Sequence, residues 1–400
     1  MKHRSIAKSA LFGAITCALA QPALAVTDEE FNELKEQFDL LAEQVEQNSN
    51  LDWHSAAGSK TTVGGYGELH YNNLSNGQGT DKKLLDFHRF VLFVNHEFND
   101  EIRFFSELEV EHAYMNDNND GSGETSSGEI GIEQAIIQFD LSETTKANAG
   151  ILLIPAGIMN RRHEPPTFYG VERNPVEKNI IPTTWSESGA MLTGQYSSGF
   201  RYDAAITSGL DGGTNIRSGR QKNSYATANN LAATGRVKYT GKPGLELSAT
   251  VQYQDDMTQD TSDEIGNAIL TEAHVRWQIT DLTLTALYAN WDIDVKDTAS
   301  QDDKDKDNQN GGYLEASYKF NPAWGVFVRQ NEWDNGGFVT SGSTSQSQTD
   351  IGFNYWPHEN VVLKADYQMQ SDFQKFDSVT GTTKTVAGFD GFNLGLGYQF

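Results

Sequence analysis

The sequence predicts an all-β fold, a transmembrane antiparallel β-barrel of about 16 strands, preceded by a short N-terminal coiled-coil helix. Three observations lead to this prediction. The chain begins with an export signal, its apolar and polar residues alternate with a period of two from residue 61 onward, and short turns alternate with long polar loops. The modest 37% hydrophobic content is compatible with a barrel, because lipid-facing and lumen-facing residues alternate along each strand.

Residues 1–25 are predicted to be a signal peptide. Lys2, Arg4 and Lys8 precede an apolar stretch at 10–20, and an A-x-A cleavage site follows at 23–25. The single cysteine, Cys17, lies in this segment, so the mature chain would contain no disulfide or thiolate. Removing three basic and no acidic residues takes the formal net charge from −25 to −28. Such a charge makes nucleic acid an unfavourable partner.

Residues 26–48 are predicted to form a periplasmic coiled-coil helix. Apolar residues recur there at spacings of three and four, at Phe31, Leu34, Phe38, Leu41 and Val45. An amphipathic helix lying on its own domain is the alternative. A coiled coil between subunits is favoured, because three heptads alone are marginal and an apolar seam needs partner helices. Residues 49–60 are predicted to be a linker.

The barrel is predicted to occupy residues 61–400. Clear alternation is present at 101–115, 244–254 and 360–370. Short turns are expected at 99–100, 142–146, 197–199, 241–244, 280–281, 321–322 and 357–360. Long polar loops are expected at 74–83, 116–128, 155–186, 209–230, 255–267, 292–311, 334–346 and 371–388. Seven turns and eight loops imply about 16 strands, with the short turns in the periplasm.

The third long loop, 155–186, differs from the others in composition. It contains five of the nine prolines, which keep it out of both strand and helix. It also carries apolar and aromatic residues, which disordered segments lack. Because the lumen of a 16-stranded barrel is wide enough for water, we expect this loop to fold inward and narrow it. Its charged residues are the predicted constriction, with Arg161, Arg162 and Arg173 as the basic side: Arg161, Arg162, Glu164, Glu172, Arg173, Glu177 and Lys178.

Alternation also predicts charged residues on the lumen face of the strands. The main candidates are Arg103, Glu107, Glu109, Arg201, Arg236, Arg276 and Arg329. A lining of both signs is typical of a weakly selective channel, or of one for zwitterionic or neutral solutes. Opposed basic and acidic walls would create a transverse field that orients dipolar solutes.

Two regions carry a resemblance to a known family. The segments 85–113 and 164–185 resemble the phosphate-selective porins O and P and their porin-like relatives. Separately, the final strand ends in Phe400, which resembles the assembly signal of bacterial outer-membrane proteins. The likeness to the porin family covers about 61–400. It implies 16-stranded homotrimers in the outer membrane whose third loop folds into the pore, and some relatives carry an N-terminal coiled coil. Phosphate selectivity is not predicted, because that chemistry relies on a lysine-rich constriction and this loop has one lysine, Lys178.

The predicted function is therefore that of a porin, a passive channel for small hydrophilic solutes or ions in the bacterial outer membrane. The expected surroundings are membrane lipid and lipopolysaccharide. Two alternatives stay open, a structural envelope tether or adhesin barrel without an open pore, and a soluble exported β-protein.

An enzyme is not predicted, because the sequence has no HExxH, CxxC or glycine-rich phosphate motif. No cofactor and no metal site are predicted either. Alternate aspartates at Asp303, Asp305 and Asp307 resemble the start of a calcium loop. However, Asn308 replaces the required glycine and Leu314 the required glutamate, so the match fails.

Overall fold

The computed structural model describes residues 60–113, 128–377 and 380–400. All of them belong to the second of two compact units, Leu51–Phe400. The predicted signal peptide at 1–25, the predicted coiled-coil helix at 26–48 and nearly all of the linker lie outside the described residues. Helices are short: α3 (Val176–Asn179), α4 (Gln301–Lys304) and the 3₁₀ turn η1 (Pro165–Thr167). No helix within the described ranges is long and apolar enough to cross a membrane.

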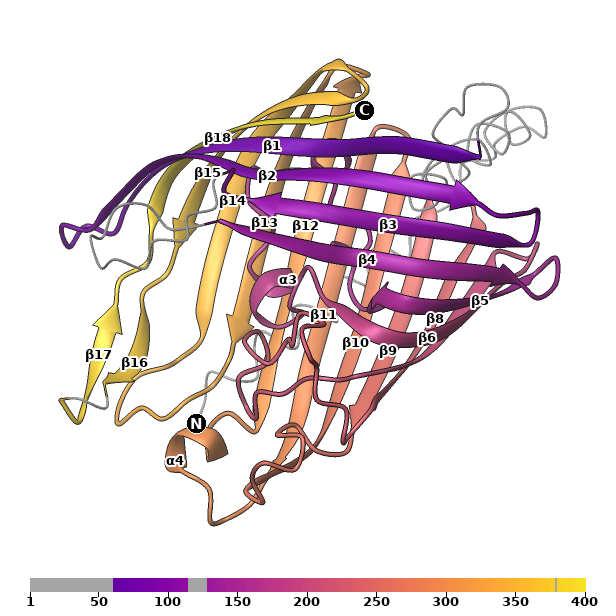
Figure 1. The fold of residues 1–400 in the computed structure, drawn as a ribbon. Coiled ribbons are helices and arrows are strands. Elements are labelled where there is room, and N and C mark those ends of the chain that lie inside the picture. The colour runs from indigo at the N-terminus through magenta and orange to yellow at the C-terminus, as the bar shows by residue number, and fades with distance from the viewer. Residues whose placement is uncertain (1–59, 114–127, 378–379) are drawn as a thin grey trace. The chain divides into compact units, whose positions relative to one another are not determined.

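Sixteen antiparallel strands close into a barrel, which confirms the predicted fold class and strand number (Figure 1). Each strand pairs with its neighbours along the chain, and β1 closes the barrel by pairing with the last strand, β18. The strands are β1 (Thr61–Ser75), β2 (Asp81–Glu97), β3 (Ile102–Glu111), β4 (Glu129–Asp140), β5 (Thr145–Leu153), β6 (Ser186–Gln195), β7 (Phe200–Thr207), β8 (Ala232–Lys242), β9 (Leu245–Gln254), β10 (Ile265–Ile279), β11 (Leu282–Val295), β12 (Asn308–Asn321), β13 (Trp324–Asp334), β14 (Gln346–His358), β15 (Val361–Gln370) and β18 (Asp390–Gln399).

One element departs from the predicted pattern. The last long polar loop, expected at 371–388, contains a separate two-stranded hairpin of β16 (Phe373–Asp377) and β17 (Thr382–Val386), which was not predicted. These strands pair with each other and are not part of the barrel.

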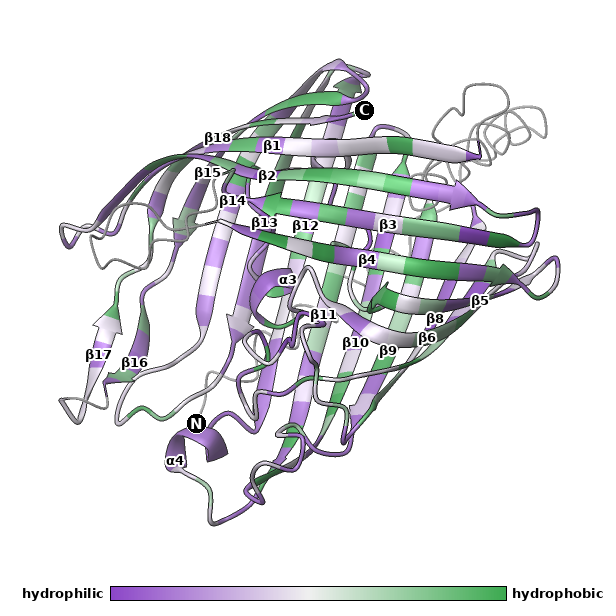
Figure 2. Cartoon of the chain, viewed as in Figure 1, coloured by the Kyte–Doolittle hydropathy of each residue, from purple (hydrophilic) through white to green (hydrophobic). Residues whose placement is uncertain are grey.

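The two faces of the barrel wall have opposite polarity. On β9, Leu247 and Val251 are exposed, whereas Thr250 and Gln252 between and beside them are buried. The same alternation of apolar and polar residues runs along most strands in Figure 2. A water-soluble protein buries its apolar face, so exposed apolar and buried polar residues indicate an outer face that contacts lipid.

Near their long-loop ends, β10 to β13 reverse this pattern. Leu287, Trp291 and Ile293 on β11 are buried inside, whereas Asp292 is exposed outside. They form an apolar core with the segment 154–185, which joins β5 to β6, through residues such as Ile180 and the loop's Trp185. The inward apolar face therefore gives this segment a surface on which to pack.

The segment 154–185 is anchored inside the barrel by hydrogen bonds to several strands. Trp291 Nε1 on β11 donates to the Ile180 carbonyl at 2.9 Å. On the opposite side, Lys364 Nζ of β15 donates to the Gly170 carbonyl at 2.9 Å, and the Val171 amide donates to Asp366 Oδ2 at 2.6 Å. Figure 1 shows α3, which belongs to this segment, surrounded by barrel strands.

Candidate functional site: a cavity between walls of opposite charge

A buried carboxylate, Glu177 of α3, fixes the local fold of the segment 154–185. Its Oε2 accepts hydrogen bonds from the amides of Ile158 and Met159 at 2.7 and 2.6 Å, and its Oε1 accepts one from the Tyr313 hydroxyl at 2.8 Å. Burial raises the pKa of Glu177. The side chain is fully buried, so Glu177, one of the predicted constriction residues, organises the segment.

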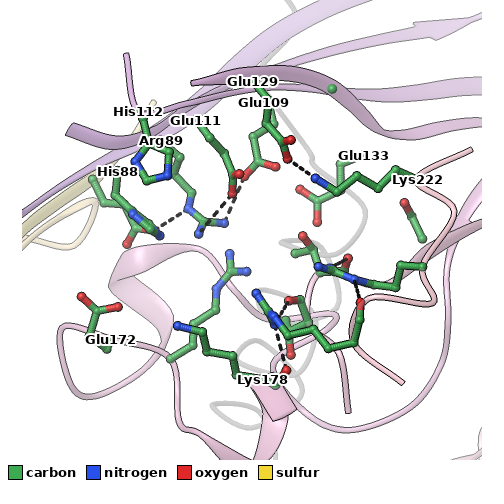
Figure 3. Close-up of a pocket in the computed structure, with 18 of the residues that line it drawn as sticks. His88, Arg89, Glu109, Glu111, His112, Glu129, Glu133, Glu172, Lys178 and Lys222 are labelled. Atoms are coloured by element: carbon green, nitrogen blue, oxygen red, sulfur yellow. Dashed lines mark hydrogen bonds and ion pairs between the residues drawn. The ribbon is translucent and has the colours of Figure 1, made fainter. Parts of the chain in front are cut away.

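A cavity of about 440 Å³ lies between this segment and the strands β1 to β4 (Figure 3). Six carboxylates and six Lys or Arg side chains are among the described residues that line it. The connection 208–231, between β7 and β8, and Ser186 at the start of β6 contribute the remaining part of its wall.

The acidic wall comes from the strands. Its carboxylates project from β1, β3 and β4: Glu68, Glu109, Glu111, Glu129 and Glu133. One cation of this wall, Arg89 on β2, pairs with Glu68 at 2.7 Å and with Glu109 at 3.0 Å. Because one guanidinium is shared by several carboxylates, the wall keeps an excess of negative charge.

The basic wall comes from the two inserted connections. Arg173 and Lys178 belong to 154–185, and Arg217, Arg220 and Lys222 belong to 208–231. Arg217 Nη1 donates to the Lys178 carbonyl at 2.8 Å, and Arg220 Nη1 donates to the Thr184 carbonyl at 2.7 Å. Backbone carbonyls orient these guanidinium groups without cancelling their charge. Partial burial lowers the pKa of Arg217 to about 10, so it stays a cation at neutral pH.

Lys222 forms an ion pair with Glu129 and so joins the basic wall to the acidic one. Figure 3 shows the labelled glutamates of β3 and β4 on one side of the cavity and Lys178 on the other. The arrangement is a narrow space with a field directed from one wall to the other.

A second cavity of about 440 Å³ lies on the other side of the connection 208–231. Arg217, Arg220 and Lys222 line both cavities, and Lys306 and several amides complete the second one. None of its described lining residues is a carboxylate, so its surface is positive.

The other predicted constriction residues separate into two groups. Arg173, Glu172 and Lys178 line the cavity, and Glu172 accepts hydrogen bonds from His70 and Asn72 at 3.1 and 3.0 Å. Burial alone would raise the pKa of Glu172. The hydrogen bond from His70, together with the positive charges of His70, His88 and Lys178, outweighs burial and holds this pKa well below its usual range.

Arg161, Arg162 and Glu164 are not among the described residues that line the cavity. Arg161 lies 3.9 Å from Asp203, and Arg162 Nη2 is 2.6 Å from Glu246. Burial lowers the pKa of Arg161 to about 9 and raises that of Glu164. Of the three arginines predicted as the basic side, only Arg173 is among the described residues that line this cavity.

The predicted lumen arginines are mostly neutralised by neighbouring carboxylates. Arg236 Nε donates to Asp203 at 2.8 Å, and Arg201 lies 3.6 Å from Asp203. Elsewhere, Arg103 Nη1 lies 2.8 Å from Asp140, and Arg329 Nη1 lies 3.2 Å from Glu315. Arg276 on β10 is directly opposite Glu246 on β9 in the strand register. Of the predicted lumen carboxylates, Glu109 lines the cavity, whereas Glu107 is buried behind it.

Sequence reasoning missed the cations of 208–231 and the carboxylates Glu129 and Glu133. The three cations lie within six residues, at Arg217, Arg220 and Lys222, which is the one signal that could have identified them.

No family model matches the chain. A relative is an uncharacterized protein of Aquifex aeolicus (strain VF5), which is 31% identical over 355 residues, or 79% of this chain and 77% of that protein.

Three solved structures show the fold. An anion-selective porin from Comamonas acidovorans has a TM-score of 0.56 at 12% identity, covering 86% of this chain and 100% of that one. The outer-membrane channel DcaP of Acinetobacter baumannii has a TM-score of 0.56 at 12% identity, covering 87% and 99%. A trimer form of OmpT from Vibrio cholerae has a TM-score of 0.54 at 13% identity, covering 85% and 99%. The chain therefore belongs to the family of the Aquifex aeolicus protein and has the closed-barrel fold of outer-membrane porins.

Proposed function

We propose that the protein is an outer-membrane porin, a passive diffusion channel for small hydrophilic solutes or ions. The cavity between the acidic and basic walls carries this proposal. A polar cavity inside a barrel with an apolar outer face is a favourable path for water-soluble molecules. The segments 154–185 and 208–231 would together form the narrowest part, which extends the sequence-based expectation from one loop to two.

The charge distribution supports a preference for small zwitterions and anions. A positive second cavity attracts anions, and the field between the walls favours solutes that carry both charges. Phosphate specificity, which characterises the porin O and P family, is not part of this proposal, because the segment 154–185 contains one lysine, Lys178, and no lysine cluster.

A homotrimer surrounded by membrane lipid and lipopolysaccharide belongs to the same proposal. Its support is the apolar outer face of the barrel and the trimer form recorded for one structure of the same fold. A periplasmic coiled coil at 26–48 would add contacts between subunits.

Liposome swelling tests the proposal. Vesicles that contain the purified full chain should swell in isotonic glycine or small sugars and should stay unchanged in a large oligosaccharide. Swelling equal to that of protein-free vesicles, from protein that migrates as a folded barrel, would reject the channel. It would favour the structural tether or adhesin barrel instead.

A further inference from the structure

A cluster of three ionisable side chains lies behind the acidic wall. Glu107 of β3, Glu133 of β4 and His163 of the segment 154–185 place one ligand atom each within 4.8 Å of one another. The three residues are between 2% and 5% exposed. The cluster therefore joins two neighbouring strands of the barrel wall to the inserted segment.

The cluster contains more negative charge than its own contacts satisfy. Among the described residues, neither carboxylate oxygen of Glu133 has a hydrogen-bond partner, and His163 Nδ1 has none. The buried hydroxyl of Tyr66, whose ring is edge-on to His163 at 5.9 Å, also has no hydrogen-bond partner within the described ranges. A buried carboxylate is strongly unfavourable unless a proton, a cation or hydrogen bonds compensate it.

The contacts of His163 in the cluster are long: the one to Glu107 is a hydrogen bond at the upper end of the length range, and the one to Glu133 is an ion pair without a hydrogen bond. His163 Nε2 lies 3.4 Å from Glu107 Oε1 and 3.7 Å from Glu133 Oε1. Charge-assisted hydrogen bonds are about 2.7–2.9 Å long. In a tetrahedral zinc site with bonds of about 2.0–2.1 Å, neighbouring ligand atoms are about 3.4 Å apart. The spacing therefore matches ligands arranged around a metal ion.

A second histidine cluster nearby shows the opposite geometry. His88 Nδ1 lies 3.0 Å from Asp86 Oδ2, and His112 Nδ1 lies 2.9 Å from the same oxygen. These are ordinary hydrogen-bond lengths, so the second cluster is satisfied by its own contacts.

We propose that Glu107, Glu133 and His163 bind a divalent transition-metal ion of the Zn²⁺ class, which clamps the segment 154–185 to the barrel wall. Two carboxylates neutralise the dication. The imidazole favours Zn²⁺ over Ca²⁺ and Mg²⁺, which prefer oxygen ligands alone. Glu133 also lines the cavity, which gives the ion a route to the site and leaves room for water as a further ligand.

Calorimetric titration of the metal-stripped full chain in detergent with Zn²⁺ tests this site. We expect one saturable site per chain that Mg²⁺ does not compete for. His163→Gln and Glu133→Gln should each weaken it by more than about a hundredfold, since even second-shell partners of metal ligands contribute about ten- to hundredfold.

His112→Gln in the second cluster is the matched control and should keep the site. Zn²⁺ should also protect 154–185 from proteolysis in the wild-type protein and in His112→Gln, but not in His163→Gln. If a variant fails to fold, as judged by heat-modifiable migration, the wild-type titration still decides. The absence of a saturable site in wild type, or a site lost in His112→Gln and kept in His163→Gln, would overturn the proposal.

Discussion

Replacing Arg217 and Arg220 with glutamine should reduce the preference of the channel for anions. Glutamine still donates to backbone carbonyls, such as those of Lys178 and Thr184 that hold the two guanidinium groups, so the connection 208–231 should keep its fold. The double change removes two positive charges from both cavities. Net charge and the electric field change, whereas the shape of the path changes little.

The size of the effect follows from the dimensions of the cavity. A sphere of about 440 Å³ has a radius of about 5 Å, so a passing ion is roughly 6 Å from each charged group. In water each charge then contributes about 0.7 kcal/mol, which screening at 0.15 M salt reduces to about 0.3 kcal/mol. Each of the two charges attracts anions and repels cations by this amount, so together they separate the two ions by about 1.3 kcal/mol. Their removal should therefore lower the anion-to-cation permeability ratio about tenfold.

The assay is the reversal potential in a planar bilayer under a KCl gradient. In about 1 M salt the Debye length is about 3 Å, so the shift in the permeability ratio should shrink to about twofold. The control is Arg103→Gln with Lys146→Gln, which removes the same charge near Asp140, outside the lining of the cavity. An unchanged ratio at low salt, or an equal shift in the control, would refute the reasoning that these two arginines face the permeating ions.

Three further predictions concern the segment 154–185. Glu177→Ala leaves two amides and a tyrosine hydroxyl without their acceptor, so the barrel should lose about 3 kcal/mol of stability, measured by denaturant titration. Because the pKa of Glu172 is lowered in the folded protein, its ionised carboxylate stabilises the segment at neutral pH. This stabilisation is lost as the pH falls from about 4.3, the unfolded pKa, through the lower pKa of the folded state. Proteolysis of the segment should therefore rise over that pH range, and Glu172→Gln should remove this pH dependence. Gly397→Ala places a methyl group against Pro165, so the thermal midpoint should fall by the equivalent of about 1–3 kcal/mol, whereas Gly235→Ala, which meets open space, should not lower it.

The strand number was predictable from the sequence because turns and loops alternate in composition. Proline or glycine is present in four of the seven expected short turns, the other three are short polar stretches, and a period of two marks the strands between them. The hairpin of β16 and β17 was missed, because its strands are only five residues long and lie within a polar loop. Short elements give too few repeats of the period to be recognised.

The inserted segment was identified by its prolines, but the direction of its side chains was not. Arg161 and Arg162 are adjacent, yet one lies near Asp203 and the other pairs with Glu246. Such pairs join residues that are distant in the sequence, so no local pattern specifies them. The same reason explains why the basic wall of 208–231 and the cluster of Glu107, Glu133 and His163 were not predicted, since each depends on contacts between separate connections and strands.

Cysteine accessibility tests the central claim, that solutes pass through the cavity between the charged walls. Gly131 on β4 lines the cavity, and a side chain there meets open space. Cys17 is the only natural cysteine and lies in the predicted signal peptide, so the mature chain offers a clean background. Gly235 on β8 is the matched control, because it is exposed between the buried Thr234 and Arg236 and so lies on the outer face of the barrel.

The measurement is the single-channel conductance of Gly131→Cys before and after a bulky, charged thiol reagent. The account predicts a stable open conductance that falls in steps when the reagent reacts, whereas the conductance of Gly235→Cys stays constant. A folded barrel without conductance, or a conductance that is unchanged after complete labelling of Gly131→Cys, would contradict it.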